Sequence, residues 1–348
     1  KAIADTKYFV DAFGRTRPAE AASAAYALAS VYEKRGDRDA VIAQLRDYVR
    51  AWGARGGQDR LVIAHARIAG LLWHAACPVA EVDGACVKVV RERAIATRYA
   101  AKKTKDLRLH CGPQTKLTLV RRDERKLREA LAEVDAAEAA FARLHAEADP
   151  GFGGARYWFA QSKLIQADAL YERFLAIEFP GNLDFDPAPE HKAIRARSQA
   201  RLTEWLDHKR TAAAAANAAY GKVLAIRDNA SSIAAAAREG QITQTFSDQL
   251  AGAEVPKDVR SGEFAQDKVD AYCDALTDLS EPLADKSLAA YRACLTRSTE
   301  LGWFSDWSKL CERELGQLRP DEFPTASELR ADPSKVAQVI AGEPPPAL

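Results

Sequence analysis

Six cysteines, in two groups of three, are the residues of this 348-residue sequence with the clearest chemical potential. The first group is Cys77, Cys86 and Cys111, and the polar loop from Cys77 to Cys86 contains an Asp-Gly turn pair. A disulfide across so short a loop would restrict the unfolded chain, an effect worth about 2–4 kcal/mol. We expect a Cys77–Cys86 disulfide, with Cys86–Cys111 or unpaired thiols as alternatives.

A metal centre is a further alternative for the same segment. His74 lies three positions before Cys77, and His110 directly precedes Cys111, so with Cys86 there are up to five nitrogen and sulfur ligands. Structural zinc sites commonly have close ligand pairs at both ends, whereas here only one end has the two-residue gap. The spacing therefore favours the disulfide, and we expect no cofactor.

The second cysteine group, Cys273, Cys294 and Cys311, stands among predicted helices. Cys294 occupies a position where the local pattern needs a small buried residue, and Cys311 follows Leu310. Free cysteine packs as a small apolar residue. The sequence therefore leaves two alternatives for this group: unpaired thiols in the core, or a disulfide that involves Cys273.

A block of positive charge covers residues 88–128. Fourteen Lys and Arg against four acidic residues give it a net charge of +10, so the rest of the chain carries −9. Such asymmetry attracts an anionic partner, and the candidate surface is Lys88, Arg91, Arg93, Arg98, Lys102, Lys103, Lys105 and Arg108. Tyr99 is the block's single aromatic residue, which disfavours stacking on single-stranded nucleic acid. A solvated loop is the simpler interpretation.

Signals for catalysis are weak. The glycine-rich residues 151–154 lack the Lys-Ser/Thr pair of a phosphate loop, and no histidine has a serine or cysteine partner at a recognisable spacing. Asp184 and Asp186 fit turn or cap positions better than an acid pair. We expect a protein that is not an enzyme.

Three aromatic residues near the end of the chain, Trp303, Phe304 and Trp307, follow helical spacing. We expect them in the core, although an exposed pair would instead make a strong binding anchor.

The elements that position these residues are predicted to be helices. A small residue, an aromatic four positions later and then a leucine recur along the chain, as Ala137/Phe141/Leu144, Ala167/Tyr171/Leu175, Ala216/Tyr220/Leu224 and Ser287/Tyr291/Leu295. Periodicity predicts a helical hairpin from residue 21 and helices over 63–73, 123–145, 155–179, 190–227, 232–250, 268–279, 283–300 and 305–318. Alternation at 86–91 and 116–121 predicts two strands of a β-hairpin.

The first hairpin resembles a tetratricopeptide repeat (TPR) at Leu28, Ala29, Tyr32, Gly36, Val41, Leu45 and Tyr48. In that family the small residue lets two helices touch, the large residues fill the hairpin and the glycine makes the turn. Segments 238–241, 246–249, 269–272 and 301–310 resemble, more loosely, large TPR proteins of bacterial envelope and gliding-motility machinery. The resemblance implies an all-α solenoid of stacked hairpins that binds protein partners.

The expected organisation has four parts. Residues 1–75 would form N-terminal TPR-like hairpins, 76–120 a basic, cysteine-containing β-hairpin insertion, 121–319 a degenerate helical array and 320–348 a proline-rich tail. No run approaches the ~20 apolar residues of a membrane-spanning helix, and a chain starting at Lys1 is expected to be mature or a fragment.

The function that fits these features is a protein-protein interaction scaffold of an extracytoplasmic, periplasmic envelope assembly. A partner would lie on the concave face of the solenoid and contact the basic insertion. The alternatives are a binder of nucleic acid or another anionic polymer through residues 88–128, and a metal-dependent protein that uses His74, Cys77, Cys86 and Cys111.

Overall fold

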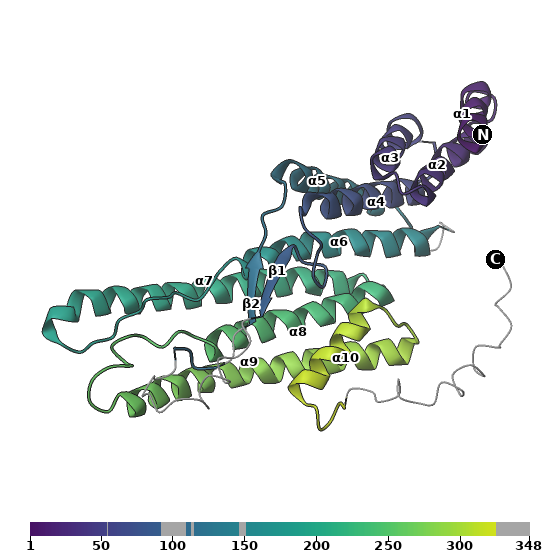
Figure 1. Cartoon of the computed structure of the whole chain (residues 1–348). Helices are drawn as coiled ribbons and strands as arrows, with labels where there is room; N and C mark the ends of the chain where they lie inside the picture. The colour runs from purple at the N-terminus through teal and green to yellow at the C-terminus, as the bar shows by residue number, and fades with distance from the viewer. Residues whose placement is uncertain (54, 92–108, 113–114, 146–150, 325–348) are drawn as a thin grey trace.

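A computed structural model describes residues 1–53, 55–91, 109–112, 115–145 and 151–324 of the chain (Figure 1). These residues are mostly helical, with one two-stranded sheet. The predicted all-α class with a small β-hairpin is therefore confirmed. Within the same residues no helix has both the length and the apolar character needed to cross a membrane.

Up to residue 145, the described helices and strands are α1 (Ala2–Phe13), α2 (Pro18–Lys34), α3 (Arg38–Trp52), α4 (Gln58–Ala76), β1 (Val87–Arg91), β2 (Thr115–Leu119) and α5 (Glu124–Phe141). From residue 151 onward they are α6 (Phe152–Leu175), the 3-10 turn η2 (Pro189–His191), α7 (Lys192–Ala225), α8 (Asn229–Ala251), α9 (Ala265–Leu301) and α10 (Asp306–Leu318).

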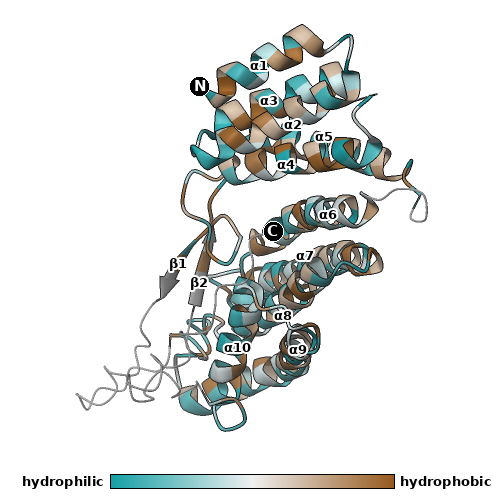
Figure 2. Cartoon of the chain, turned by 90° about the vertical axis from the view of Figure 1, so that its right-hand side faces the viewer, coloured by the Kyte–Doolittle hydropathy of each residue, from teal (hydrophilic) through white to brown (hydrophobic). Residues whose placement is uncertain are grey.

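Helices that are neighbours in sequence pack against each other along the whole series from α1 to α10. In addition, α4 contacts α6, α6 contacts α8, and α8 contacts α10. Figures 1 and 2 show the resulting stack, with α1–α5 at one end and α6, α7, α8 and α9 following in order. The even-numbered helices from α4 onward therefore form a continuous row.

Short-range signals account for several helix ends. Gly36, at φ +71°, makes the predicted turn between α2 and α3, and the Asp37 side chain then caps α3 by accepting from the Ala40 N–H. Asp123 and Asp228 cap α5 and α8 in the same way. Capping is worth roughly 1 kcal/mol per helix, so the sequence fixes where these helices begin.

The recurring small residues lie where helices touch. Ala137, Ala167, Ala216 and Ser287 are each 0% exposed. Their positions allow close helix approach because a larger side chain would push the neighbouring helix away. The final leucine of the pattern is less regular, since Leu224 is 37% exposed.

Helix α6 joins the two ends of the stack. Its residues Leu164, Ala167 and Phe174 belong to a core shared with α7, α8 and the strands, whereas Ile165 belongs to the core of α2–α5. A helix that buries residues all round is typical of an interior position. The stack therefore has no break in its apolar packing at α6.

One helix prediction is wrong, and one helix was missed. Residues 268–300 were predicted as two helices, but α9 continues through Pro282. A proline removes one helical hydrogen bond, and here α8 packs along α9, where Ser247 donates to the carbonyl of Ser280. Packing on both sides of the proline holds the helix together. Helix α1 was not predicted at all, and it contains no buried residue.

The β-hairpin is antiparallel, with Val87 opposite Leu119 and Val89 opposite Leu117. It lies beside α6 and α8 at the edge of the stack (Figure 2). Val87 is 3% exposed and belongs to the main core, and Leu117 and Leu119 pack against that core. Because the strands contribute to the core, removing them would expose apolar surface of the helices.

Candidate functional site

All six cysteines form disulfides within the described residues: Cys77–Cys86, Cys111–Cys273 and Cys294–Cys311. The Cys77–Cys86 pair is the one that the sequence favoured. The alternative Cys86–Cys111 bridge is not formed, since tertiary folding brings Cys111 to α9. The core-thiol interpretation of Cys294 and Cys311 is also wrong, because these two residues lie on adjacent helices and pair with each other.

The disulfides remove the cysteine thiolates that the alternative metal site would need as ligands. Cys77 and Cys86 bond to each other, and His74 Nδ1 lies 2.7 Å from a carboxylate oxygen of Glu81. In the part of the chain that the structure describes, no three His, Cys, Asp or Glu side chains are grouped to hold a metal ion. A group that depends on thiolate ligands therefore does not fit these residues.

The structure describes only part of the basic block, residues 88–128. Arg93, Arg98, Lys102, Lys103, Lys105 and Arg108 lie outside the described residues, and Arg91 is placed as the last residue of β1. Lys88 is exposed on β1. Arg122, counted with the block, is buried. Because six of the eight predicted residues lie outside the described residues, the anionic-partner hypothesis stays a prediction.

Arg122 instead ties the hairpin to the helices. Its Nη2 lies 2.7 Å from carboxylate oxygens of both Glu81 and Glu172, and its guanidinium stacks 3.6 Å from the ring centroid of Trp73. The backbone N–H of Cys86 donates to the same Glu172. A buried guanidinium with two carboxylates and an aromatic face fixes the base of the hairpin against α4 and α6.

A second buried cation, Arg238, connects helices of the even-numbered row. Arg238 on α8 is 0% exposed, and it donates from Nε and Nη2 to the two carboxylate oxygens of Asp168 on α6, at 2.9 and 3.2 Å. Its guanidinium lies between the rings of Tyr171 and Trp307. Burial opposes the charge, but the carboxylate of Asp168 raises the pKa of Arg238 above its ordinary value. This group links α6, α8 and α10.

Lys209 on α7 is buried, and no carboxylate of the described residues forms an ion pair with it. Its Nζ donates to the carbonyls of Phe174 and Ile177, at 2.7 and 2.9 Å, and lies over the Phe174 ring. Burial disfavours the charged amine and lowers the pKa of Lys209 to about 7. The side chain has no access to solvent, so we assign it a structural role.

The lowered pKa of Lys209 makes stability depend on pH. Between about pH 7 and 10.5 the unfolded chain binds a proton at Lys209 that the folded chain does not, so raising the pH through this window stabilises the fold. We expect the stability of the native protein, relative to Lys209→Met, to rise by about 1–3 kcal/mol between about pH 7.5 and 9.5. Urea unfolding at both pH values measures this difference.

Lys222→Met is the matched control, since Lys222 is an exposed lysine on the same helix. Its stability relative to the native protein should stay constant over the same pH range. A constant difference for Lys209→Met as well would show that the buried amine keeps an ordinary pKa.

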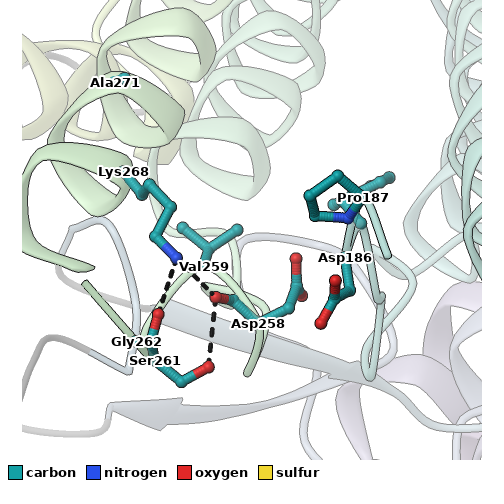
Figure 3. Close-up of a pocket in the computed structure, with 9 residues that line it drawn as sticks. Asp186, Pro187, Asp258, Val259, Ser261, Gly262, Lys268 and Ala271 are labelled. Atoms are coloured by element: carbon teal, nitrogen blue, oxygen red, sulfur yellow. Dashed lines mark hydrogen bonds between the residues drawn. The ribbon is translucent and has the colours of Figure 1, made fainter. Parts of the chain in front are cut away.

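A half-open cavity of about 510 Å³ lies where three segments meet. The connector between α6 and η2, the loop between α8 and α9, and the start of α9 provide its lining residues: Phe185, Asp186, Pro187, Asp258, Val259, Ser261, Gly262, Lys268 and Ala271. We call this cavity the acidic cleft, because the carboxylates of Asp186 and Asp258 face each other across it (Figure 3).

Turn chemistry positions the connector side of the acidic cleft. The Asp184 carboxylate accepts from the N–H of Asp186, and the Asp186 carboxylate accepts from the N–H of Ala188. His191 Nδ1 lies 3.1 Å from the other oxygen of Asp184. The N–H of Asp186, together with His191, holds the pKa of Asp184 below its ordinary value. Both aspartates therefore shape turns, as the sequence predicts, and Asp186 also lines the cleft.

The loop side is held by backbone contacts. Lys268 Nζ donates to the carbonyls of Ser261 (2.7 Å) and Asp258 (3.3 Å), and Figure 3 shows both bonds. Arg260 Nε donates to the carbonyl of Val255 at 2.9 Å. The ammonium of Lys268 is thereby directed at the loop backbone, and among the described residues no ion pair joins it to either carboxylate of the cleft.

The Cys111–Cys273 disulfide lies next to this loop. The N–H of Cys111 donates to the carbonyl of Ala253, and the N–H of Val255 donates to the carbonyl of Leu109. These contacts connect residues 109–111 to α9 and to the loop before it. The disulfide thus braces one wall of the acidic cleft.

Two of the predicted core aromatics are exposed. Trp303 and Phe304 are 47% and 70% exposed after the end of α9, while Trp307 packs on Arg238. Gly302, at φ +60°, ends α9 and turns the chain. The core prediction is therefore wrong for Trp303 and Phe304, because this turn takes them off the buried face.

Sequence reasoning did not identify the acidic cleft. Asp186 and Asp258 are far apart in the chain, and neither stands in a motif that marks a binding residue. The turn-rich composition around each residue was the available signal, since binding residues are often carried by loops.

No protein-family model, curated protein or solved structure matches this chain. The functional conclusion therefore rests on geometry and chemistry.

Proposed function

We propose that this chain is a non-enzymatic scaffold for protein-protein interaction, built as a TPR-like array of helical hairpins. The observation that carries the proposal is the packing order, in which each helix contacts its sequence neighbours and α4, α6, α8 and α10 form a row. Such quasi-linear stacks offer long surfaces relative to their size, and binding is their common use.

The three disulfides support an extracytoplasmic location. Disulfides form and persist in oxidising compartments such as the bacterial periplasm and the extracellular space. We propose that the scaffold belongs to an envelope assembly. The resemblance to gliding-motility proteins stays a prediction.

Two surface features at opposite ends of α9 are suited to hold a partner. The acidic cleft lies at the start of this helix, and Trp303 and Phe304 follow its end. At 1.5 Å per residue, the 37 residues of α9 separate the two by roughly 55 Å. Large exposed aromatics contribute strongly to interfaces when a partner buries them.

The double variant Trp303→Ser/Phe304→Ser tests the proposal. We expect it to retain the native fold with a stability change within about 0.5 kcal/mol, because both side chains are exposed. Partner binding should weaken about thirtyfold or more, since interface anchors of this kind contribute at least about 2 kcal/mol. Affinity purification from cells that make the protein, with quantitative mass spectrometry, measures retention by native and variant baits.

Ile194→Ser is the control bait, because Ile194 is an exposed apolar residue on a different helix, α7. A protein retained by the native and Ile194→Ser baits, and lost from the double variant, is the expected result. If no protein distinguishes the native bait from the double variant, the assignment of this surface is wrong.

A further inference from the structure

We propose that β1 binds a strand of a partner protein along its outer edge, and that this strand alternates apolar with acidic residues. The inference rests on the proposed scaffold function, since it names how one surface of the scaffold would hold a partner. Three features of the hairpin carry it: open backbone groups on β1, one buried and one exposed face, and strong positive charge.

The hydrogen bonds of the hairpin show which backbone groups of β1 point away from β2. The N–H of Val120 donates to the carbonyl of Cys86 at 2.8 Å. In an antiparallel pair, every second residue of a strand bonds to the opposite strand, and the residues between direct their N–H and C=O to the other side. Counted from Cys86, Lys88 bonds to β2, whereas Val87 and Val89 direct their backbone groups to the outer edge.

This outer edge of β1 is open in the part of the chain that the structure describes. The N–H of Val87 donates to the carbonyl of Ala85 at 3.0 Å, but no described residue bonds to the Val87 carbonyl or to either backbone group of Val89. On the other side of the hairpin β2 contacts α6, and Figure 2 shows β1 as the strand farther from the helices. Open edges of this kind accept a further strand.

The two faces of β1 decide which side chains the added strand needs. Val87 is buried in the main core, and Val89, two positions later, lies on the same face and is half-buried. Lys88 lies on the other face and is exposed. A strand paired with β1 would direct every second side chain toward the helices and the others to the solvent side, beside Lys88. Alternate positions of the partner strand should therefore be apolar.

Positive charge selects acidic residues for the solvent-facing positions of the added strand. Residues 88–128 have a net charge of +10 by sequence, and Lys88 is exposed on β1. Opposite charges on facing strand residues attract each other. Two copies of this chain joined through β1 would instead bring two basic blocks together, and like charges repel. An acidic strand of a different protein is therefore favoured over a second copy.

The base of the hairpin is held in place before a partner arrives. The guanidinium of Arg122 lies against Glu81, Glu172 and Trp73, and the N–H of Cys86 donates to the same Glu172. The disulfide between Cys86 and Cys77 closes the loop that precedes β1. A preformed edge loses less conformational entropy on binding than a mobile one does.

Strand-forming peptides test the inference. Three labelled peptides of equal length, in which valine alternates with Glu, Gln or Lys, would be titrated against the full-length protein. We expect the Glu peptide to bind most tightly and the Lys peptide most weakly, because only the Glu peptide complements Lys88 and the basic block.

Val89→Pro tests the backbone bond. It removes an N–H that points away from β2, so the bonds within the hairpin stay intact, and proline is tolerated at such edge positions. We expect the Glu peptide to bind about tenfold or more weakly, because the peptide carbonyl loses its donor. Val89→Ala is the matched control, since it also removes the valine side chain but keeps the N–H, and it should bind the Glu peptide as the native protein does.

Lys88→Glu tests the charge. It should reduce the preference for the Glu peptide over the Lys peptide about fivefold or more, because an attractive pair becomes a repulsive one. Lys222→Glu makes the same change at an exposed position of α7 and should leave the preference unchanged.

Hydrogen exchange of the native protein keeps the test decisive if Val89→Pro misfolds. In the free protein the Val89 amide should exchange faster than the Lys88 amide, because Lys88 alone of the two bonds to β2. Binding of the Glu peptide should slow exchange at Val89 about tenfold or more, since the amide gains an acceptor.

Four results would each overturn the inference: no binding or equal binding of the three peptides, native-like Glu-peptide binding by folded Val89→Pro, a preference unchanged in Lys88→Glu, or unchanged exchange at Val89. These failures are distinct from failure of the scaffold proposal, which is read from the Trp303→Ser/Phe304→Ser bait. Loss of a partner from that bait, together with no Glu-peptide binding, would leave the scaffold and remove only the strand site.

Discussion

Asp168→Ala is expected to lower the free energy of unfolding by about 3–5 kcal/mol, because it leaves a fully buried guanidinium without its counter-charge. Arg238 is 0% exposed and donates twice to the Asp168 carboxylate. Tyr220, also 0% exposed, donates its hydroxyl to the same carboxylate and would lose its acceptor. Urea or guanidinium unfolding, monitored by circular dichroism, measures the loss.

The surface pair Arg46–Glu129 is the control for this effect. Its side chains are 42% and 34% exposed, so Glu129→Ala should cost less than about 1 kcal/mol. Replacing both buried partners, as Asp168→Leu/Arg238→Met, should restore much of the stability that the single variant loses. A loss below about 1 kcal/mol for Asp168→Ala would show that the buried charge finds another partner.

Removing the Cys111–Cys273 disulfide is the second large effect. Its cysteines are 162 positions apart, so the bond closes nearly half of the 348-residue chain into a loop, and loop entropy gives about 5 kcal/mol. The Cys77–Cys86 bond, with a separation of 9, gives about 3 kcal/mol by the same relation. Paired serine variants should therefore rank in this order by thermal and denaturant unfolding.

The Cys111→Ser/Cys273→Ser variant should also loosen the loop beside the acidic cleft, because residues 109–111 bond to Ala253 and Val255. Hydrogen exchange of the Val255 amide reports that change directly. An unfolding midpoint equal to that of the Cys77→Ser/Cys86→Ser variant would contradict the ranking.

Local patterns in the sequence predict much of the fold. Small residues such as Ala167 and Ala216 repeat at helical spacing and are fully buried, and the alternation that includes Val87 and Leu117 gives the paired strands. These signals are short-range, since both depend on which side of one element faces the core. The predicted hairpin at Gly36 is local for the same reason.

The features that the sequence did not predict depend on tertiary contacts. Pro282 suggests a helix end, yet packing of α8 along α9 carries the helix through it. Arg122 stands in a basic run that looks solvated, but Glu81, Glu172 and Trp73 meet it from distant positions. Nothing in local composition distinguishes Arg122 from its exposed neighbour Arg121.

The acidic cleft also could not be predicted from local sequence patterns. Asp186 and Asp258 are brought together by the contact between two turn-rich loops, and that contact follows from how α6, α7, α8 and α9 stack. The turn role of Asp184 was predictable, since it depends on the two residues that follow. The sequence did not indicate which of the two aspartates, Asp184 or Asp186, lines a cavity.

Site-specific photo-crosslinking in the cells that make the protein tests the scaffold proposal most directly. A photoreactive phenylalanine analogue would replace Phe304, Phe264 or, as the control, Leu224 at the exposed end of α7. The proposal predicts a discrete adduct with another protein from positions 304 and 264 and none from 224. Absence of any protein adduct at both 304 and 264, in correctly folded protein, would contradict it.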